Sequence, residues 1–215
     1  MPDNRKPVID GNHRGRYKAR MKGASSLSFF LGLLLLTSGC ASTIPFKVGH
    51  DKLKDPPTTR EGVLTIKTLT DTRAVTNAMQ IGGKWAKAKP AYVAKQDRPV
   101  ADIVTDGIRE ALEKVNYKIQ STPDATTPVL DGELFEFWLT DNWSGAFCKI
   151  GVLLRLRQGE GETVLWEKRL RAEEDDMVII PNAMQAAMTS LLQSAVTEFS
   201  STAFAEAVAG RKQVY

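Results

Sequence analysis

Very few residues in this chain have the types and spacing that catalysis or metal binding requires. After residue 39 the chain holds one histidine, His50, and, besides Cys40, one cysteine, Cys148. A serine or cysteine hydrolase needs a base held beside its nucleophile, and His50 lies in a charged, proline-containing stretch that suits no such site. Cys148 lies on the apolar face of an alternating segment, which favours a buried, inert thiol over a reactive one. We therefore expect no enzymatic activity, no metal site and no cofactor.

The residue with the clearest chemical context is Cys40. The apolar run Leu27–Leu36 has ten residues, which is too short for a membrane span of about 20 residues but has the size of a signal-peptide core. Five basic residues between positions 14 and 22 precede the run, and three small residues lead from it to Cys40. A start at Met21 satisfies the same pattern as a start at Met1. An ordinary secretory signal with an incidental cysteine is the alternative.

Leu36-Thr37-Ser38-Gly39-Cys40 resembles the lipobox of bacterial lipoproteins, with Thr37 where Leu is commoner. The resemblance implies cleavage between Gly39 and Cys40, diacylation of the Cys40 sulfur and acylation of its new amino group. It also implies anchoring in the outer membrane, facing the periplasm, because Ala41 stands where lipoproteins retained in the inner membrane often carry Asp.

The net charge of the whole chain, +4, comes from its first segment. Residues 1–39 hold seven Lys or Arg and two Asp, which leaves 22 of the 29 basic and 23 of the 25 acidic residues after them. A mature net charge of −1 carries no basic footprint for nucleic acid, so we expect no nucleic-acid partner. The sequence divides into a signal peptide (1–39), a lipidated cysteine and tether (40–60), one globular domain (61–209) and a tail (210–215).

Hydrophobic periodicity predicts the elements of the domain. Alternation predicts a first strand around Leu64 and Ile66, a short strand at 118–121, and three further strands within 128–141, 146–157 and 163–171. The third strand needs a bulge near Phe135, because Phe135 and Phe137 break its alternation. Apolar steps of three and four predict helices from Pro99 to a left-handed stop at Asn116, and from about Asn182 with a bend at 200–202. The run Glu173–Asp176 is expected in a solvated turn.

The order β-α-β-β-β-β-α predicts an α+β fold. We expect a mixed, mainly antiparallel sheet of about five strands with two amphipathic helices on one face, since that arrangement buries both apolar stripes.

Several short motifs resemble the YajG-like bacterial lipoproteins over about residues 40–205. They are the lipobox, Asp71-Thr72-Arg73, Ile81-Gly82, the helix ending before Tyr117, and Leu130-x-Gly132-x-Leu134, with Asn116 where Gly is commoner. The layout is more loosely similar to auxiliary lipoproteins of lipid-transport ABC systems and to activators of cell-wall synthases. The resemblance implies an envelope protein without catalytic residues.

Two groups of residues are candidates for binding. The segment 72–96 has no acidic residue, and its basic and aromatic side chains suit an anionic membrane surface or an acidic partner, although a plain loop is the simpler interpretation. Its candidate contacts are Arg73, Lys84, Trp85, Lys87, Lys89, Tyr92 and Lys95. The second group is aromatic and either lines a groove for an acyl chain or fills the core, the core being the simpler interpretation. Its members are Phe135, Phe137, Trp138, Trp143, Phe147 and Trp166.

Three functions follow in order of preference. The first is a non-enzymatic outer-membrane lipoprotein that serves as adaptor or accessory subunit of an envelope assembly, with an envelope protein as partner. The second is a periplasmic lipid-binding or lipid-transport auxiliary lipoprotein. An envelope hydrolase comes last.

Replacing Cys40 with alanine tests the anchor. Each buried methylene contributes about 0.8 kcal/mol, so several acyl chains hold a protein on the membrane where one is marginal. We expect Cys40→Ala to remain an unprocessed precursor without the lipid. Intact-mass analysis of the mature wild-type protein is the measurement, and an unmodified Cys40 would contradict the prediction.

Overall fold

The computed structural model describes residues 42–44, 53–75, 77–83, 90–94, 98–122, 124, 126–142, 145–159, 161–176 and 180–210. The chain divides into two units, residues 1–39 and 40–215, and all described residues belong to the second. None of the described helices is long and apolar enough to cross a membrane.

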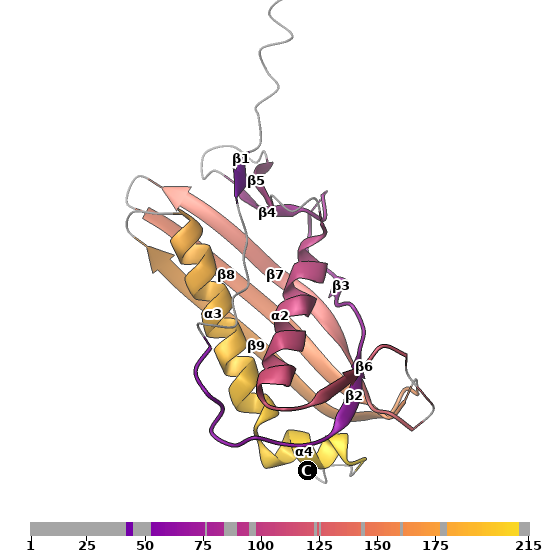
Figure 1. The fold of residues 1–215 in the computed structure, drawn as a ribbon. Helices are drawn as coiled ribbons and strands as arrows, with labels where there is room; N and C mark the ends of the chain where they lie inside the picture. Colours follow the sequence, from indigo (N-terminus) through magenta and orange to yellow (C-terminus); the bar gives the residue numbers. More distant parts are fainter. Residues whose placement is uncertain are drawn as a thin grey trace, which may run out of the picture. The chain divides into compact units, whose positions relative to one another are not determined.

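Three long antiparallel strands form one side of the sheet (Figure 1): β7 (Val129–Asn142), β8 (Gly145–Arg157) and β9 (Val164–Asp176). Their register aligns apolar side chains across the sheet, with Leu134 opposite Val152 and Val152 opposite Leu170. Alternate residues of β8 are fully buried from Cys148 to Leu156, so one face of this sheet forms one side of the core. The segment between Arg157 and Val164 joins β8 to β9.

Shorter strands complete the sheet on the other side of β7. Strands β2 (Val63–Ile66), β3 (Thr70–Asp71) and β4 (Gln80–Gly83) each pair with β7 in parallel. Strand β6 (Lys118–Gln120) extends the sheet beyond β2. Strands β5 (Pro90–Ala94) and β1 (Ser42–Ile44) extend it beyond β4.

The predicted α+β class with a mixed sheet is confirmed, but the sheet is larger than the five strands expected. The additional strands β1, β3, β4 and β5 are two to five residues long. Such short strands lack a repeating apolar pattern, and β4 and β5 lie in the segment 72–96 that the sequence indicated as a loop.

Two helices cover one face of the sheet side by side, as predicted (Figure 1). Helix α2 (Val100–Lys114) buries its apolar stripe and ends before Asn116, whose φ of 83° is the expected left-handed stop. Helix α3 (Ile180–Phe199) ends at the predicted bend. A third, short helix α4 (Thr202–Val208) then begins, because the Ser201 side chain caps it by accepting a hydrogen bond from the Phe204 amide.

An aromatic cluster packs at the end of the core next to α4. The rings of Trp166 and Phe204 meet edge to face with centroids 4.8 Å apart, and those of Phe199 and Phe204 also lie 4.8 Å apart. The Tyr117 hydroxyl donates to the carbonyl oxygen of Phe199 at 3.2 Å, and burial raises the pKa of Tyr117 to about 12. This cluster ties β9 to the junction between α3 and α4.

The predicted bulge is present in β7. The register against β8 shifts between Leu134 and Glu136, so Phe135 is the extra residue. Leu134 and Phe137 are therefore both buried although they are three positions apart, and Trp138 is 41% exposed on the opposite face.

Gly132, like Gly82 in β4, lies in the sheet where a side chain would collide with backbone atoms. A Cβ atom there would lie 2.0 Å from the Leu153 carbonyl oxygen, which is backbone and cannot move aside cheaply. We expect Gly132→Ala to lower the free energy of unfolding by about 2–4 kcal/mol. Urea denaturation of residues 41–215 measures the change. Gly161→Ala, between β8 and β9, is the control: its Cβ would lie 3.1 Å from the Gln158 carbonyl oxygen, so it should cost about 1 kcal/mol or less.

Candidate interaction surface

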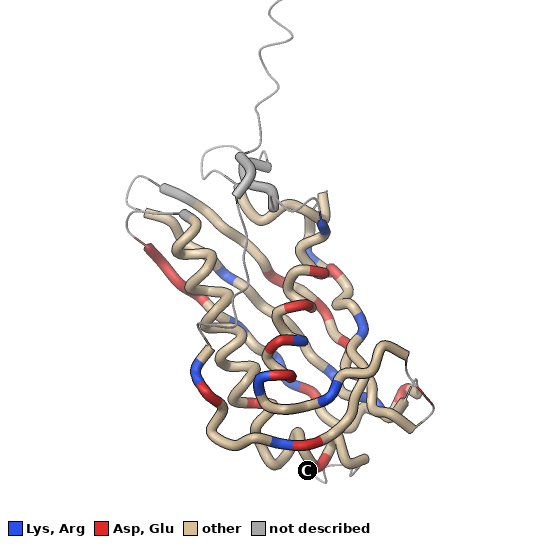
Figure 2. Tube along the Cα trace, in the orientation of Figure 1, with Lys and Arg blue, Asp and Glu red and all other residues tan. Residues whose placement is uncertain are grey.

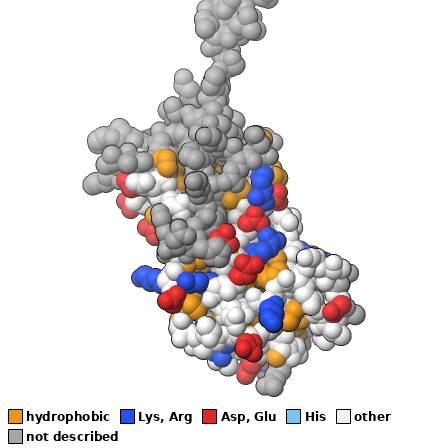
Figure 3. Space-filling view, in the orientation of Figure 1, with side chains coloured by type: hydrophobic (Ala, Val, Ile, Leu, Met, Phe, Trp, Pro, Cys, Tyr) orange, Lys and Arg blue, Asp and Glu red, His pale blue; other side chains and the backbone are white. Residues whose placement is uncertain are grey.

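The face of β7, β8 and β9 that points away from the helices carries a network of charged side chains with aromatic side chains beside it. We call it the open face. Its side chains alternate with those of the core, because every second residue of a strand points outward. Its charged members are Asp131, Glu133, Glu136, Lys149, Arg155, Arg157, Glu167, Arg169, Arg171, Glu173 and Asp175. Figure 3 shows the other, helix-covered side, where acidic, basic and hydrophobic side chains are also interspersed.

Ion pairs join neighbouring strands across the open face. The Arg155 guanidinium reaches Glu133 on β7 and Glu167 on β9, both at 2.7 Å, so it spans all three strands. These hydrogen bonds raise the pKa of Arg155. Three further pairs, Arg157–Asp131 at 2.7 Å, Lys149–Glu173 at 2.9 Å and Arg171–Glu136 at 3.6 Å, follow the same pattern. Because these charges are partly exposed, each pair contributes only about 0.2–1 kcal/mol, but together they fix the orientation of the side chains.

Aromatic side chains lie beside these ion pairs near the bulge. The Arg169 and Arg171 guanidinium carbons lie 4.0 and 5.2 Å from the centroid of the Phe135 ring. The Lys149 ammonium lies 5.0 Å from the ring of Phe147. Trp138, opposite Lys149, is the larger of the two exposed large hydrophobic residues in the described part of the chain. We call Phe135, Trp138, Phe147 and these three cations the aromatic patch.

The aromatic group singled out from the sequence thus divides in two. Phe137 and Trp166 are buried in the core. Phe135, Trp138 and Phe147 lie on the open face, and Trp143 lies outside the described residues. The core interpretation is therefore confirmed for Phe137 and Trp166 only. The bulge at Phe135 was the sequence signal that could have identified Trp138 as an outward-facing residue, because it exchanges the two faces of the strand.

Arg73 differs from its expected role as a surface contact. Its side chain is 3% exposed and lies 2.6 Å from the Asp71 carboxylate. It also donates to the carbonyl oxygens of Gln80 at 2.6 Å and Ala78 at 3.1 Å, so it holds together the connection between β3 and β4. A guanidinium engaged in this way cannot reach an anionic surface. Tyr92 lies in β5, and Lys84, Trp85, Lys87, Lys89 and Lys95 lie outside the described residues.

Burial opposes ionisation of Asp71 and by itself would raise the pKa. The hydrogen bonds and positive charge of Arg73 outweigh burial, and the pKa of Asp71 is lowered from its ordinary value of 3.8. The carboxylate is thus ionised wherever the domain is folded at neutral pH, and it neutralises the buried guanidinium.

The other reactive or charged residues singled out from the sequence lie in the core or in the sheet where the structure describes them. Cys148 is fully buried, and burial raises the pKa of its thiol to about 12, which fits the predicted inert thiol. The acidic run Glu173–Asp176 was expected in a turn but forms the end of β9. Its residues continue to pair with β8, up to Asp176 opposite Ala146. Gly39 and Cys40 lie outside the described residues.

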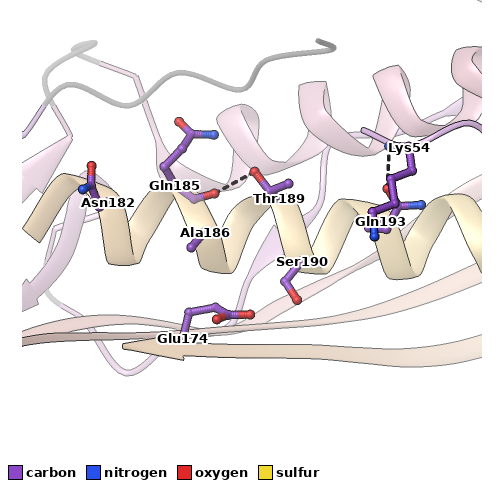
Figure 4. Close-up of a pocket in the computed structure, with 8 residues that line it drawn as sticks. All are labelled: Lys54, Glu174, Asn182, Gln185, Ala186, Thr189, Ser190 and Gln193. Atoms are coloured by element: carbon purple, nitrogen blue, oxygen red, sulfur yellow. Dashed lines mark hydrogen bonds between the residues drawn. The ribbon is translucent and has the colours of Figure 1, made fainter. Parts of the chain in front are cut away.

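Two hollows open on the surface of the described part of the chain. One, of about 490 Å³, lies beside α3 above β9 (Figure 4). It is lined by Lys54, Glu174, Asn182, Gln185, Ala186, Thr189, Ser190 and Gln193. The other, of about 420 Å³, lies between the segment 67–72 and strands β7 and β8. Both linings are rich in polar side chains, whereas a site for an acyl chain needs a mainly apolar lining.

No protein-family model and no curated protein matches the chain. Solved structures do. Protein XCC0632 from Xanthomonas campestris, described as DUF330, superposes with a TM-score of 0.56 at 12% sequence identity, covering 79% of this chain and 99% of that protein. The chain shares the fold of that protein.

Two further solved structures are less similar. Protein CT253 from Chlamydia trachomatis has a TM-score of 0.44 at 11% identity, with 66% of this chain and 98% of that one covered. Lipoprotein GNA1162 from Neisseria meningitidis has a TM-score of 0.33 at 15% identity, with 63% and 94% covered.

The pair between Asp71 and Arg73 predicts a pH-dependent stability. A carboxylate whose pKa is lowered on folding stabilises the fold above its unfolded pKa, and this stabilisation disappears as the pH falls through the lower, folded pKa. We expect Asp71→Asn to lower the free energy of unfolding by about 3 kcal/mol at neutral pH, because it leaves the Arg73 charge buried without a counter-ion.

Urea denaturation of residues 41–215 at a series of pH values measures this contribution. The difference between wild type and Asp71→Asn should shrink as the pH drops below 3.8. Asp106→Asn, which removes the exposed partner of Arg98 and Arg109, is the control and should cost about 0.5 kcal/mol or less. An equal effect of the two variants would contradict the role given to Asp71.

Proposed function

We propose that this chain is a non-enzymatic lipoprotein, anchored in the outer membrane through Cys40 and facing the periplasm, that acts as an adaptor or accessory subunit of an envelope assembly. The lipobox and the YajG-like motifs support the anchoring. The observation that carries the binding role is the exposed Trp138 beside an arginine-stacked Phe135 on the open face. Aromatic residues and arginine are the residues most enriched at the centres of protein interfaces.

Buried neighbours and an ion pair hold the residues around Trp138 in place, which favours binding. The sheet under Trp138 is fixed by buried neighbours on the other face, among them Leu139 and Cys148. The ion pair between Lys149 and Glu173 holds the cation opposite Trp138. A surface whose side chains are ordered before binding loses less conformational entropy when a partner docks. The partner class that fits is a protein offering an apolar contact to Trp138.

A lipid carrier is a weaker candidate. Two of its expected groove-lining residues, Phe137 and Trp166, pack in the core instead. A cysteine hydrolase has no support in Cys148, because its thiol is buried and holds its proton. Contact of Lys84, Trp85, Lys87, Lys89, Tyr92 and Lys95 with an anionic surface stays a separate proposal.

Site-specific photo-crosslinking tests the binding role. A photoreactive phenylalanine analogue replaces Trp138 in the full chain, which is irradiated in its native envelope. Val63 on β2 is the matched control site, because it is exposed to a similar extent, 39% against 41%. We expect position 138, and not position 63, to yield a crosslink to a different envelope protein. Crosslinks at neither site, or equal crosslinks at both, would refute the role of the aromatic patch.

A further inference from the structure

Strand β9 leaves one edge of the sheet unpaired. It runs for 13 residues and pairs with β8 on one side. Within the described residues no strand pairs with its other side, so the backbone groups along that edge face outward. Natural proteins usually keep such edges short or cover them, because an exposed edge templates pairing with another strand. A long open edge therefore indicates a partner strand.

The charges of β9 are divided along its length. After Glu167 comes a basic segment with Lys168, Arg169 and Arg171, and the acidic run Glu173–Asp176 follows it to the end of the strand, where Figure 2 shows a red stretch. Residues 167–169, 171, 173 and 175 are all exposed. An antiparallel partner with the same sequence would bring the basic segment of each strand opposite the acidic run of the other.

We propose that two copies of this chain pair through their β9 strands, antiparallel, about a two-fold axis at Ala172. In this register Arg169 of each copy lies opposite Asp175 of the other, and Arg171 lies opposite Glu173. Directly opposed residues of antiparallel strands share a face, so these pairs all lie on the open face. A register centred one residue earlier would place Arg171 against Arg171, so the charges select the axis at Ala172.

The side chains that would meet are able to form further ion pairs. Neither Arg169 nor Asp175 makes an ion pair within the described part of the chain, and Arg169 contacts only the face of the Phe135 ring. Stacking on a ring leaves the guanidinium N–H groups able to bind a carboxylate. Arg171 and its carboxylate partner on β7 are separated by 3.6 Å, the longest of the open-face ion pairs.

The proposed axis also fixes where the two helix layers lie. A two-fold axis perpendicular to the sheet places both α3 helices on the same face, on either side of the paired edges. The hollow beside α3 lies there, and the small residues Ala186 and Ser190 project into it toward Glu174 on β9 (Figure 4). At the axis itself, Ala172 offers a short side chain that two strands can accommodate.

Charge exchange tests this pairing. The full chain is solubilised in non-ionic detergent with micelles in excess, and its protein mass is measured by light scattering after size exclusion. We expect a dimer. Arg169→Asp and Asp175→Arg should each raise the dimer Kd by about tenfold or more, since each places two like-charge pairs across the interface. The double variant Arg169→Asp/Asp175→Arg should return to within about threefold of wild type, because it exchanges the charges of the same pair.

Lys118→Asp, on the strand at the other side of the sheet, is the matched control and should leave the mass unchanged. Thermal melting checks that each variant is folded, and Asp175→Arg keeps the test available if Arg169→Asp does not fold. A monomeric wild type would overturn the proposal. A double variant as weak as the single ones, or single variants as strong as wild type, would overturn it as well.

Discussion

Side chains along a strand alternate between two faces, so one inserted residue exchanges the faces of every residue beyond it. The insertion in β7 is at Phe135, between Leu134 and Glu136. Before it Leu134 faces the helices, and after it Phe137 and Leu139 do, while Trp138 faces solvent. With an unbroken alternation, Trp138 would point at the helices and Phe137 and Leu139 outward. The filled core and the exposed aromatic patch therefore depend on the same extra residue.

The two faces of the sheet are stabilised by different forces. A fully buried Leu or Phe contributes about 1.5–3 kcal/mol, whereas an exposed ion pair contributes about 0–1 kcal/mol. Helices α2 and α3 and the buried face of β8 therefore provide the stability, and the pairs around Arg155 mainly orient side chains on a surface left open. The pair between Asp71 and Arg73 differs from the apolar core and from the exposed ion pairs, because it is a buried ion pair. It links β3 to β4, since Arg73 also donates to the Gln80 carbonyl oxygen. This division leaves the open face free to specialise in binding.

Much of the fold was predictable because the long elements repeat their patterns. Helix α2, its stop at Asn116, the bulge at Phe135 and the bend after Phe199 all followed from local signals. The short strands β3 and β4 did not, since their pairing with β7 is decided by distant contacts rather than by their own residues. For the same reason Arg73 was expected on the surface: its partners include the backbone of residues 78 and 80, which sequence spacing does not reveal. The sequence identified only part of the candidate surface, because Arg169 and Arg171 stack on Phe135 from two strands away.

Hydroxyl-radical footprinting tests most directly whether the open face is a binding surface. Oxidation of Trp138 is compared between the purified full chain and the same chain in its native envelope, with buried Trp166 as the internal reference. The account predicts that Trp138 is oxidised in the purified protein and protected in the envelope, while Trp166 is protected in both. Equal oxidation of Trp138 in the two preparations would contradict it.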